Sequence, residues 1–177
     1  MGMKRVLGCD TGTNGSIVSL TENGEFIEAF LLNTVYDTDK GYDFHKLTKY
    51  LASIADNVLI CGVEKVHSFE GTDKSTAFSM GAGLQFIHDA LAANSIQYVD
   101  IAAKTWQNYS RTNEDIVFKN ELTKTGKKKI DTKKTALNVA GRLFPNESFL
   151  ATKRSRVKHD GIIDATLIAY YTLNKFI

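Results

Sequence analysis

The chain has 177 residues, of which 43% are hydrophobic and 24% charged, with a formal net charge of +2. This length suits one domain with a substantial core, so we predict a single domain over residues 1–177. The small net charge excludes a generic polyanion binder, and the apolar runs are too short to span a membrane. No signal-peptide pattern begins the chain, and Cys9 and Cys61 are expected to be buried free thiols of a reducing cytoplasm.

Five segments have the apolar patterns of strands and alternate with helical segments. The first three strands are separated by short turns that include Asn14-Gly15, which favours an antiparallel meander. The predicted strands cover residues 5–10, 16–20, 26–32, 58–63 and 97–101, and the predicted helices cover residues 42–55, 74–93, 131–144 and 161–171. Residues 103–125 are ambiguous and are expected to hold a short helix and a loop. The pattern predicts one α/β domain, with a five-stranded mixed sheet and helices on both faces.

Three acidic residues stand out because each follows or interrupts an apolar segment: Asp10, Glu64 and Asp164. Asp10 and Glu64 end two predicted central strands, and Asp164 lies in the last helix. Carboxylates that converge among apolar residues repel one another, and a divalent cation such as Mg²⁺ removes that conflict. Two ions about 3.5–4 Å apart can activate a water and stabilise the leaving oxygen of a phosphodiester. The pattern therefore favours a metal-dependent nuclease.

Each of these acids also has a structural interpretation. Asp10 can begin the turn that follows it, because Asp before Thr-Gly is common in turns. Glu64 can pair with Lys65 or with a helix cation, and Asp164 can cap a helix, although its neighbours are apolar. These alternatives stay open for each residue taken singly, and the metal site is predicted from the three together.

An ordered set of motifs resembles the Holliday-junction resolvases of the RuvC type, in the RNase H-like superfamily. Residues 7–16 (LGCDTGTNGS) are similar to the first-strand motif of that family, and residues 62–66 (GVEKV) to the acid that ends its fourth strand. Residues 158–165 (KHDGIIDA) are similar to the acidic pair that enters its last helix, and residues 75–83 to the glycine-bearing helix that packs its dimer. The likeness runs in order over most of the chain, and the bacteriophage-encoded branch resembles it most.

The resemblance implies an RNase H-like sheet of three antiparallel strands followed by two parallel ones. It implies an endodeoxyribonuclease that resolves Holliday junctions and other branched DNA, forks and flaps included, by metal-dependent hydrolysis with paired nicks. The cofactor would be Mg²⁺ or Mn²⁺, with two ions per active site held by the catalytic acids Asp10, Glu64, Asp160 and Asp164. A homodimer packed through residues 74–93 is also implied, with Gly81 and Gly83 allowing close approach. A phage-encoded protein of this type is expected in the bacterial host cytoplasm.

The sequence departs from the family pattern just before Asp164. Many relatives have an acid or a histidine three residues ahead of the last acid, where this chain has Gly161. Asp160 shares a helix face with Asp164, whereas His159 points about 140° away at about 100° per residue. We therefore predict Asp160 as the fourth ligand if the helix begins by that residue, with Gly161 leaving room for water or phosphate. The alternative is that Asp160 only caps the helix.

Cations gather in two clusters downstream of the first acids. Such runs are usually solvated surface, but beside an acidic metal site they can hold phosphates that would otherwise be repelled. We therefore expect selection of DNA structure more than recognition of base sequence. The predicted DNA-binding residues are Lys119, Lys124, Lys127, Lys128, Lys129, Lys133 and Lys134 in the first cluster, Lys153, Arg154, Arg156 and Lys158 in the second, and Phe69.

Aromatic and histidine residues near these motifs have two interpretations each. Phe69 lies in a loop by composition and is assigned equally to core packing and to a wedge between unpaired bases. Phe78 and Trp106 are expected in the core. His67 and His159 are expected to be surface or hydrogen-bonding residues rather than metal ligands, because their spacing matches no metal site.

Three other functions stay open. Residues 10–13 (DTGT) also match the phosphate loop of ATP-binding kinases of the actin-like superfamily, and the chain would then be a kinase fragment, because it is too short for the second lobe. Protection of the melting temperature by nucleotide would reveal such a kinase. A non-catalytic branched-DNA binder on the same fold would not need the retained acids. An RNase H acting on hybrids would be monomeric and lack the dimer helix.

Overall fold

The computed structural model describes residues 2–37, 41–66, 73–123 and 125–177, and its centre is a mixed sheet of five strands. The sheet order is β3-β2-β1-β6-β7. Its strands are β1 (Arg5–Cys9), β2 (Ser16–Thr21), β3 (Phe26–Leu31), β6 (Val58–Lys65) and β7 (Tyr98–Ala102). β1 pairs antiparallel with β2, which pairs antiparallel with β3. β1 also pairs parallel with β6, which pairs parallel with β7. The predicted sheet is confirmed, and β1 lies at its centre.

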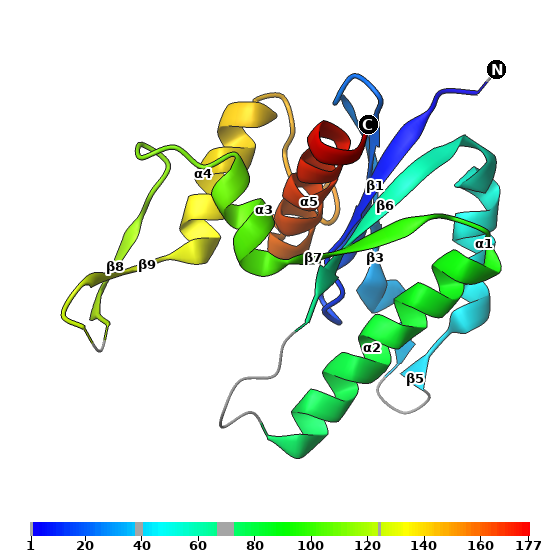
Figure 1. Cartoon of the computed structure of the whole chain (residues 1–177), viewed down its shortest axis with the longest axis horizontal. Coiled ribbons are helices and arrows are strands. Elements are labelled where there is room, and N and C mark those ends of the chain that lie inside the picture. Colours follow the sequence, from blue (N-terminus) through cyan, green and yellow to red (C-terminus); the bar gives the residue numbers. More distant parts are fainter. Residues whose placement is uncertain (1, 38–40, 67–72, 124) are drawn as a thin grey trace.

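Helices cover both faces of the sheet, as predicted (Figure 1). Their bounds are α1 (Phe44–Ile54), α2 (Lys74–Ala93), α3 (Ala103–Tyr109), α4 (Thr132–Leu143) and α5 (Asp160–Phe176). Helices α1 and α2 enclose one apolar core against the sheet, and α3, α4 and α5 enclose a second core on the other face. The chain between β3 and α1 forms the short elements η1 (Leu32–Thr34), β4 (Tyr36–Asp37) and β5 (Gly41–Tyr42), and η2 (Ala55–Asn57) leads into β6. None of the helices described here is long and apolar enough to cross a membrane.

The segment after α3 differs from the expected loop. Strands β8 (Phe118–Leu122) and β9 (Lys128–Ile130) pair antiparallel and form a hairpin that projects beyond α4 (Figure 1). The Val117 N–H donates to Thr135 Oγ1 at 3.1 Å, and the Asp131 N–H donates to the Val117 carbonyl at 2.8 Å. The hairpin is therefore anchored at its base, whereas every residue of β8 is exposed.

Helix α5 packs directly on the middle of the sheet, and glycine makes this close approach possible. A Cβ added at Gly8 in β1 would lie 2.2 Å from the Ala165 carbonyl oxygen and 2.3 Å from the Ala169 nitrogen. Both atoms belong to the α5 backbone, which cannot move as a flexible side chain can. The absence of a side chain at Gly8 therefore sets the distance between β1 and α5.

Replacing Gly8 by Ala is expected to destabilise the protein by about 1–3 kcal/mol, the usual cost of overpacking a core. The free energy of unfolding is measured by urea denaturation followed by circular dichroism. Gly141→Ala in α4 is the matched control, since an added Cβ there meets no atom within 4 Å. That control is expected to be neutral or more stable by up to about 1 kcal/mol. Equal stability of Gly8→Ala and the natural protein would contradict the proposed packing.

Candidate functional site

The parallel pairing of β1 and β6 brings two of the predicted acids to one edge of the sheet. Cys9 is opposite Val63, so Asp10, which follows β1, emerges beside Glu64 near the end of β6. The N-terminus of α5 lies over the same edge, because Ser16 Oγ donates to the Gly161 carbonyl at 2.9 Å. Asp160 and Asp164 are carried by the first turns of α5. The structure thus brings Glu64, Asp160 and Asp164 to the same edge of the sheet as Asp10.

Asp10 combines a turn with a buried charge. Its Oδ1 accepts from the Gly12 N–H at 3.2 Å, and its own N–H donates to the Ser16 carbonyl at 3.1 Å. The turn interpretation is therefore confirmed, and it does not conflict with a second role for the carboxylate. Burial raises the pKa of Asp10, and the Gly12 N–H lowers it in part.

Glu64 is partly buried and hydrogen-bonded to a tryptophan. The indole N–H of Trp106 donates to Glu64, with Nε1 3.0 Å from Oε2. Burial first, and then the charge of Asp10, raise the pKa of Glu64 to about 7, while the Trp106 N–H lowers it. Among the ion pairs of the described residues none involves Glu64, so the expected alternative of a pair with Lys65 is wrong.

Asp164 lies in the second turn of α5 and therefore does not cap that helix, which excludes its structural alternative. Burial has the largest effect and raises the pKa of Asp164 to about 8, together with the charges of Asp10, Glu64 and Asp160. Lys133 lowers it in part. Asp164 is thus repelled by the three other acids, which is the electrostatic conflict that the sequence pattern predicts.

Helix α5 begins at Asp160, as the prediction of Asp160 as a ligand requires. The N-cap of the helix is His159 and not Asp160. His159 Nδ1 accepts from the Ile162 N–H at 3.3 Å. The proton of a neutral His159 ring then lies on Nε2. Asp160 is exposed and pairs with Lys133, whose Nζ is 2.6 Å from Oδ2. The interpretation of Asp160 as a cap is wrong.

Gly161 has a different role from the one expected. A Cβ added there would lie 2.3 Å from the Asn14 carbonyl oxygen and 2.8 Å from the Gly15 Cα. The position that a side chain would take at Gly161 is therefore filled by the turn between β1 and β2, while Gly161 itself also lines a cleft together with Asp10 and Asp164. The glycine allows α5 to dock on that turn.

Asp10 lines two neighbouring cavities. One is a cleft of about 810 Å³ between the β1–β2 turn, α4 and the start of α5, lined by Asp10, Asp160 and Asp164 and by Lys133, Arg156, Lys158 and His159. The other, of about 470 Å³, is lined by Asp10, Glu64 and Tyr42 and by the hydroxyl-bearing residues Thr11, Thr13, Ser75, Thr76 and Ser79. Asp10 thus lies between a wall that carries cations and a wall that combines Glu64 with Ser and Thr residues.

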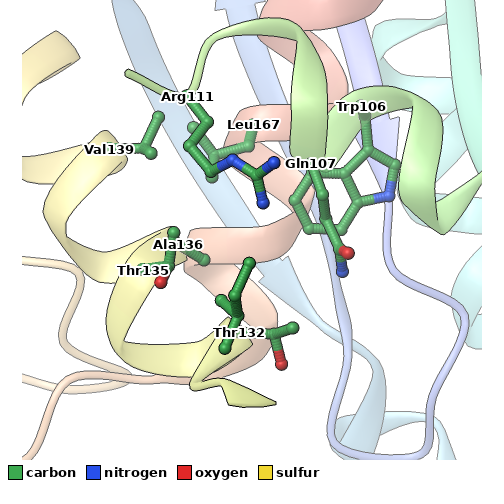
Figure 2. Close-up of a pocket in the computed structure, with 9 residues that line it drawn as sticks. Trp106, Gln107, Arg111, Thr132, Thr135, Ala136, Val139 and Leu167 are labelled. Atoms are coloured by element: carbon green, nitrogen blue, oxygen red, sulfur yellow. The ribbon is translucent and has the colours of Figure 1, made fainter. Parts of the chain in front are cut away.

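A third pocket lies beside Trp106 and is too small for a substrate, with a volume of about 20 Å³ (Figure 2). Its lining comes from α3, α4, α5, the end of β9 and the segment after α3, and includes Arg111, Ala136, Val139 and Leu167. It is a crevice of the core rather than a functional site.

The predicted DNA-binding residues fall into three places. Lys133, Arg156 and Lys158 line the larger cleft. Lys119, Lys127, Lys128 and Lys129 are exposed on or beside the β8–β9 hairpin, with Lys129 3.4 Å from Glu121. Lys134 pairs with Asp131 at 4.0 Å, and Lys153 and Arg154 are exposed in the loop before α5. Lys124 and Phe69, like His67, lie outside the described residues.

Two aromatic residues differ in outcome. Trp106 is buried at 1% exposure, as predicted, but its hydrogen bond to Glu64 could not be predicted from the sequence. Phe78 was expected in the core and is 79% exposed, because it lies on the face of α2 that turns away from the sheet.

The acids fit a hard divalent cation in chemistry, because carboxylate oxygens are the ligands that Mg²⁺ and Mn²⁺ prefer. Within the described ranges, however, no three His, Cys, Asp or Glu side chains already stand close enough together to hold a metal ion. Asp160 is also engaged by Lys133. Binding of a cation would therefore require side-chain rotation and release of Lys133.

The five-stranded mixed sheet with helices on both faces defines an RNase H-like α/β fold. Solved structures of this fold include T. thermophilus RuvC in complex with a Holliday junction substrate, with a TM-score of 0.58 and 11% identity over 97% of each chain. Another is a Thermus thermophilus RuvC structure, with a TM-score of 0.54 and 9% identity over 96% of this chain and 95% of that one. No family model and no curated protein sequence matches the chain. At these identities the likeness establishes the fold.

The raised pKa values predict how stability depends on pH. Because the folded state holds protons on Glu64 and Asp164 up to about pH 7 and about pH 8, it binds more protons than the unfolded chain above pH 4.5. The resulting stabilisation is present at low pH and is lost as the pH rises through that range. In EDTA, Asp164→Asn should therefore gain stability relative to the natural protein between pH 5 and pH 8, by at least about 1 kcal/mol, the equivalent of about one pKa unit.

This gain is measured by urea denaturation at each pH. Asp56→Asn, in the exposed η2 turn, is the matched control and should follow the natural protein. Parallel stability curves for Asp164→Asn and the natural protein would contradict a buried, repelled carboxylate at this position.

Proposed function

We propose that this chain is a structure-selective endodeoxyribonuclease that resolves Holliday junctions and other branched DNA by metal-dependent hydrolysis, with paired nicks. The observation that carries the proposal is that Asp10, Asp160 and Asp164 line a cleft whose other wall is cationic, with Glu64 beside Asp10 in the adjoining cavity. The fold supports it, because similar solved structures include a RuvC in complex with a Holliday junction substrate.

Asp10, Glu64, Asp160 and Asp164 would hold the divalent cations, Mg²⁺ or Mn²⁺, with two per site as the proposed count. When bound, such ions activate a water and stabilise the leaving oxygen of a phosphodiester. Asp10 is already oriented by the Gly12 N–H, and Asp164 is held by the rigid backbone of α5. The mutual repulsion of these carboxylates provides a driving force for taking up a cation.

The chain's own cations would hold the DNA phosphates beside the acids. Lys133, Arg156 and Lys158 line the same cleft as Asp10 and Asp164. His159 also lines it, and its Nε2–H is free to donate to a phosphate oxygen because Nδ1 caps the helix. Lys133 would leave Asp160 when a metal binds and become available to the phosphate.

The proposed partners are branched DNA, forks and flaps included, and a second copy of the chain. Phe78, Gly81 and Ala82 lie on one exposed face of α2, and an added Cβ at Gly81 meets no atom within 4 Å. This apolar face supports α2 as the dimer contact. Gly83 has another role, since a Cβ there would lie 2.6 Å from Tyr42 Oη within the same chain.

The proposed location is the cytoplasm of a bacterium, which would be a phage host if the chain is phage-encoded. The support is the pair of buried free thiols, Cys9 and Cys61, which suit a reducing compartment.

Asp10→Asn should abolish cleavage and leave junction binding intact or tighter in the presence of metal, because Asp10 binds the cation whereas the lysines bind the DNA. A labelled four-way junction, a fork and a linear duplex are incubated with Mg²⁺, Mn²⁺ or EDTA and resolved on a gel. Asp56→Asn is the control and should cut normally. Nicking by Asp10→Asn would show that Asp10 is not a required ligand of the catalytic cation. Tight binding by the natural protein without cutting would favour a non-catalytic branched-DNA binder.

Changing Lys127, Lys128 and Lys129 together to Gln should weaken junction binding and flatten the dependence of log K on log salt. Each lost phosphate contact is expected to reduce the slope by about 0.9 for duplex arms. Binding is measured by fluorescence anisotropy over a series of salt concentrations. Lys49→Gln, on α1 at the opposite face of the sheet, should leave the slope unchanged. An unchanged slope for the triple variant would show that the hairpin does not contact DNA.

Phe78→Glu should weaken the dimer at least about tenfold, or about 1.4 kcal/mol, because it places a charge in an apolar contact. Sedimentation velocity over a range of protein concentrations measures the shift. Leu122→Glu is the matched control, because Leu122 is also an exposed apolar residue, at 67%, but lies on the hairpin. A dimer unaffected by Phe78→Glu would place the interface elsewhere.

A further inference from the structure

The indole of Trp106 is buried in the core, yet its one polar atom points to the candidate metal site. Nε1 is 3.0 Å from Glu64 Oε2, and the side chain is 1% exposed. A buried indole N–H requires an acceptor. Here the acceptor is Glu64, one of the four predicted metal-binding acids, which lies 42 residues before Trp106 in the chain.

The indole is held far more firmly than the carboxylate it contacts. Helix α3 follows β7 without a loop, and β7 pairs with β6 so that Ile101 lies opposite Glu64. The indole packs in one cluster with Ala136, Val139 and Leu167. Figure 2 shows its six-membered ring toward these residues and its nitrogen on the opposite side. The N–H therefore cannot turn away unless the core opens.

A fixed donor of this kind restricts the Glu64 side chain. The indole N–H only donates, so it binds a carboxylate oxygen and favours the charged form. It engages Oε2 and so restricts rotation of the carboxylate, while no hydrogen bond to Oε1 is formed by the residues that the structure describes. Groups that orient a metal-binding carboxylate in this way typically change metal affinity by 10–100-fold when removed.

We propose that Trp106 is a positioning residue whose indole N–H restrains the Glu64 carboxylate at the site that takes up the divalent cation. The inference rests on the proposed function, because it takes Glu64 as a ligand of that cation. In this role Trp106 binds neither metal nor DNA and acts through Glu64.

Removal of a single N–H tests the proposal, and the sequence allows it because Trp106 is the only tryptophan in the chain. Growth of a tryptophan auxotroph on benzothienylalanine replaces the indole N–H by sulfur with nearly the same shape. Growth on 5-fluorotryptophan keeps the N–H and is the matched control. Near-ultraviolet circular dichroism and thermal melting verify that both proteins are folded.

Mn²⁺ affinity without DNA, measured by electron paramagnetic resonance of the free ion, should be about tenfold weaker in the benzothienyl protein than in the fluorotryptophan protein. The kcat of junction cleavage should fall with it, while the KM for junction DNA stays the same, because the phosphate-binding cations are untouched. Equal Mn²⁺ affinities in the two folded proteins would overturn the proposal.

The natural protein provides a second measurement that needs no substitution of Trp106. Because the indole donates to a metal ligand, its fluorescence should change as Mg²⁺ binds, with a midpoint that matches calorimetric binding. The change should be absent in Glu64→Gln. Calorimetric binding of Mg²⁺ with unchanged emission would contradict the proposal.

Failure of the proposed function gives a different result from failure of this inference. Suppose that metal binding requires Asp10 and depends on the Trp106 N–H, but that no branched DNA is cut. This result would contradict the proposed function and support the role of Trp106. Junction cleavage with equal metal affinity in the two analogue proteins would contradict only the proposed role of Trp106. Absence of any metal binding would overturn both.

Discussion

The close approach of α5 to strands β1 and β2 is the packing on which the candidate site depends. Gly8 lets the α5 backbone approach β1, and Gly161 lets the first turn of α5 dock on the β1–β2 turn. Ser16 Oγ then binds the Gly161 carbonyl at 2.9 Å. Because Asp160 and Asp164 are both carried by α5, a displacement of this helix by the width of a methyl group would move both acids away from Asp10. A glycine in a strand lowers stability because it loses more backbone entropy on folding than other residues. Here the glycine is explained by the close approach of α5, which places two acids.

This packing buries the carboxyl groups of Glu64 and Asp164, and no ion pair within the described residues involves either of them. Burial and mutual repulsion raise the pKa of Glu64 to about 7 and that of Asp164 to about 8, whereas Lys133 pairs only with the exposed Asp160. The same repulsion that lowers stability as the pH rises becomes a source of affinity for a cation. Stability and metal binding are therefore expected to be linked, so that a substitution that stabilises the metal-free fold weakens the site.

Most of the fold could be predicted from the sequence because its central strands are buried and its turns are short. The predicted bounds of α2 match those observed, and Asn14-Gly15 marked the first turn correctly. The β8–β9 hairpin could not be predicted, since its exposed, lysine-rich strands show no apolar alternation. The outward position of Phe78 was missed because local spacing does not tell a helix face toward the core from one away from it. The acids could be found from their places at strand ends, whereas the contact of Trp106 with Glu64 has no local signature.

In the proposed function, the distribution of charge would let a protein with a net charge of only +2 bind a polyanion. Lys133, Arg156 and Lys158 surround the acids in one cleft, and further lysines extend along the hairpin. Such cations contact phosphates, which position a DNA backbone and carry no base sequence. Beyond Asp10 the second cavity is lined by Glu64 and by Ser and Thr residues, and within the described ranges no cation lines it. In the proposed function, one side of the scissile phosphate would thus lie against cations and the other against Glu64 and hydroxyl-bearing side chains. A strand that leaves its duplex at a branch can satisfy both walls, which gives a physical basis for selection by structure rather than by sequence.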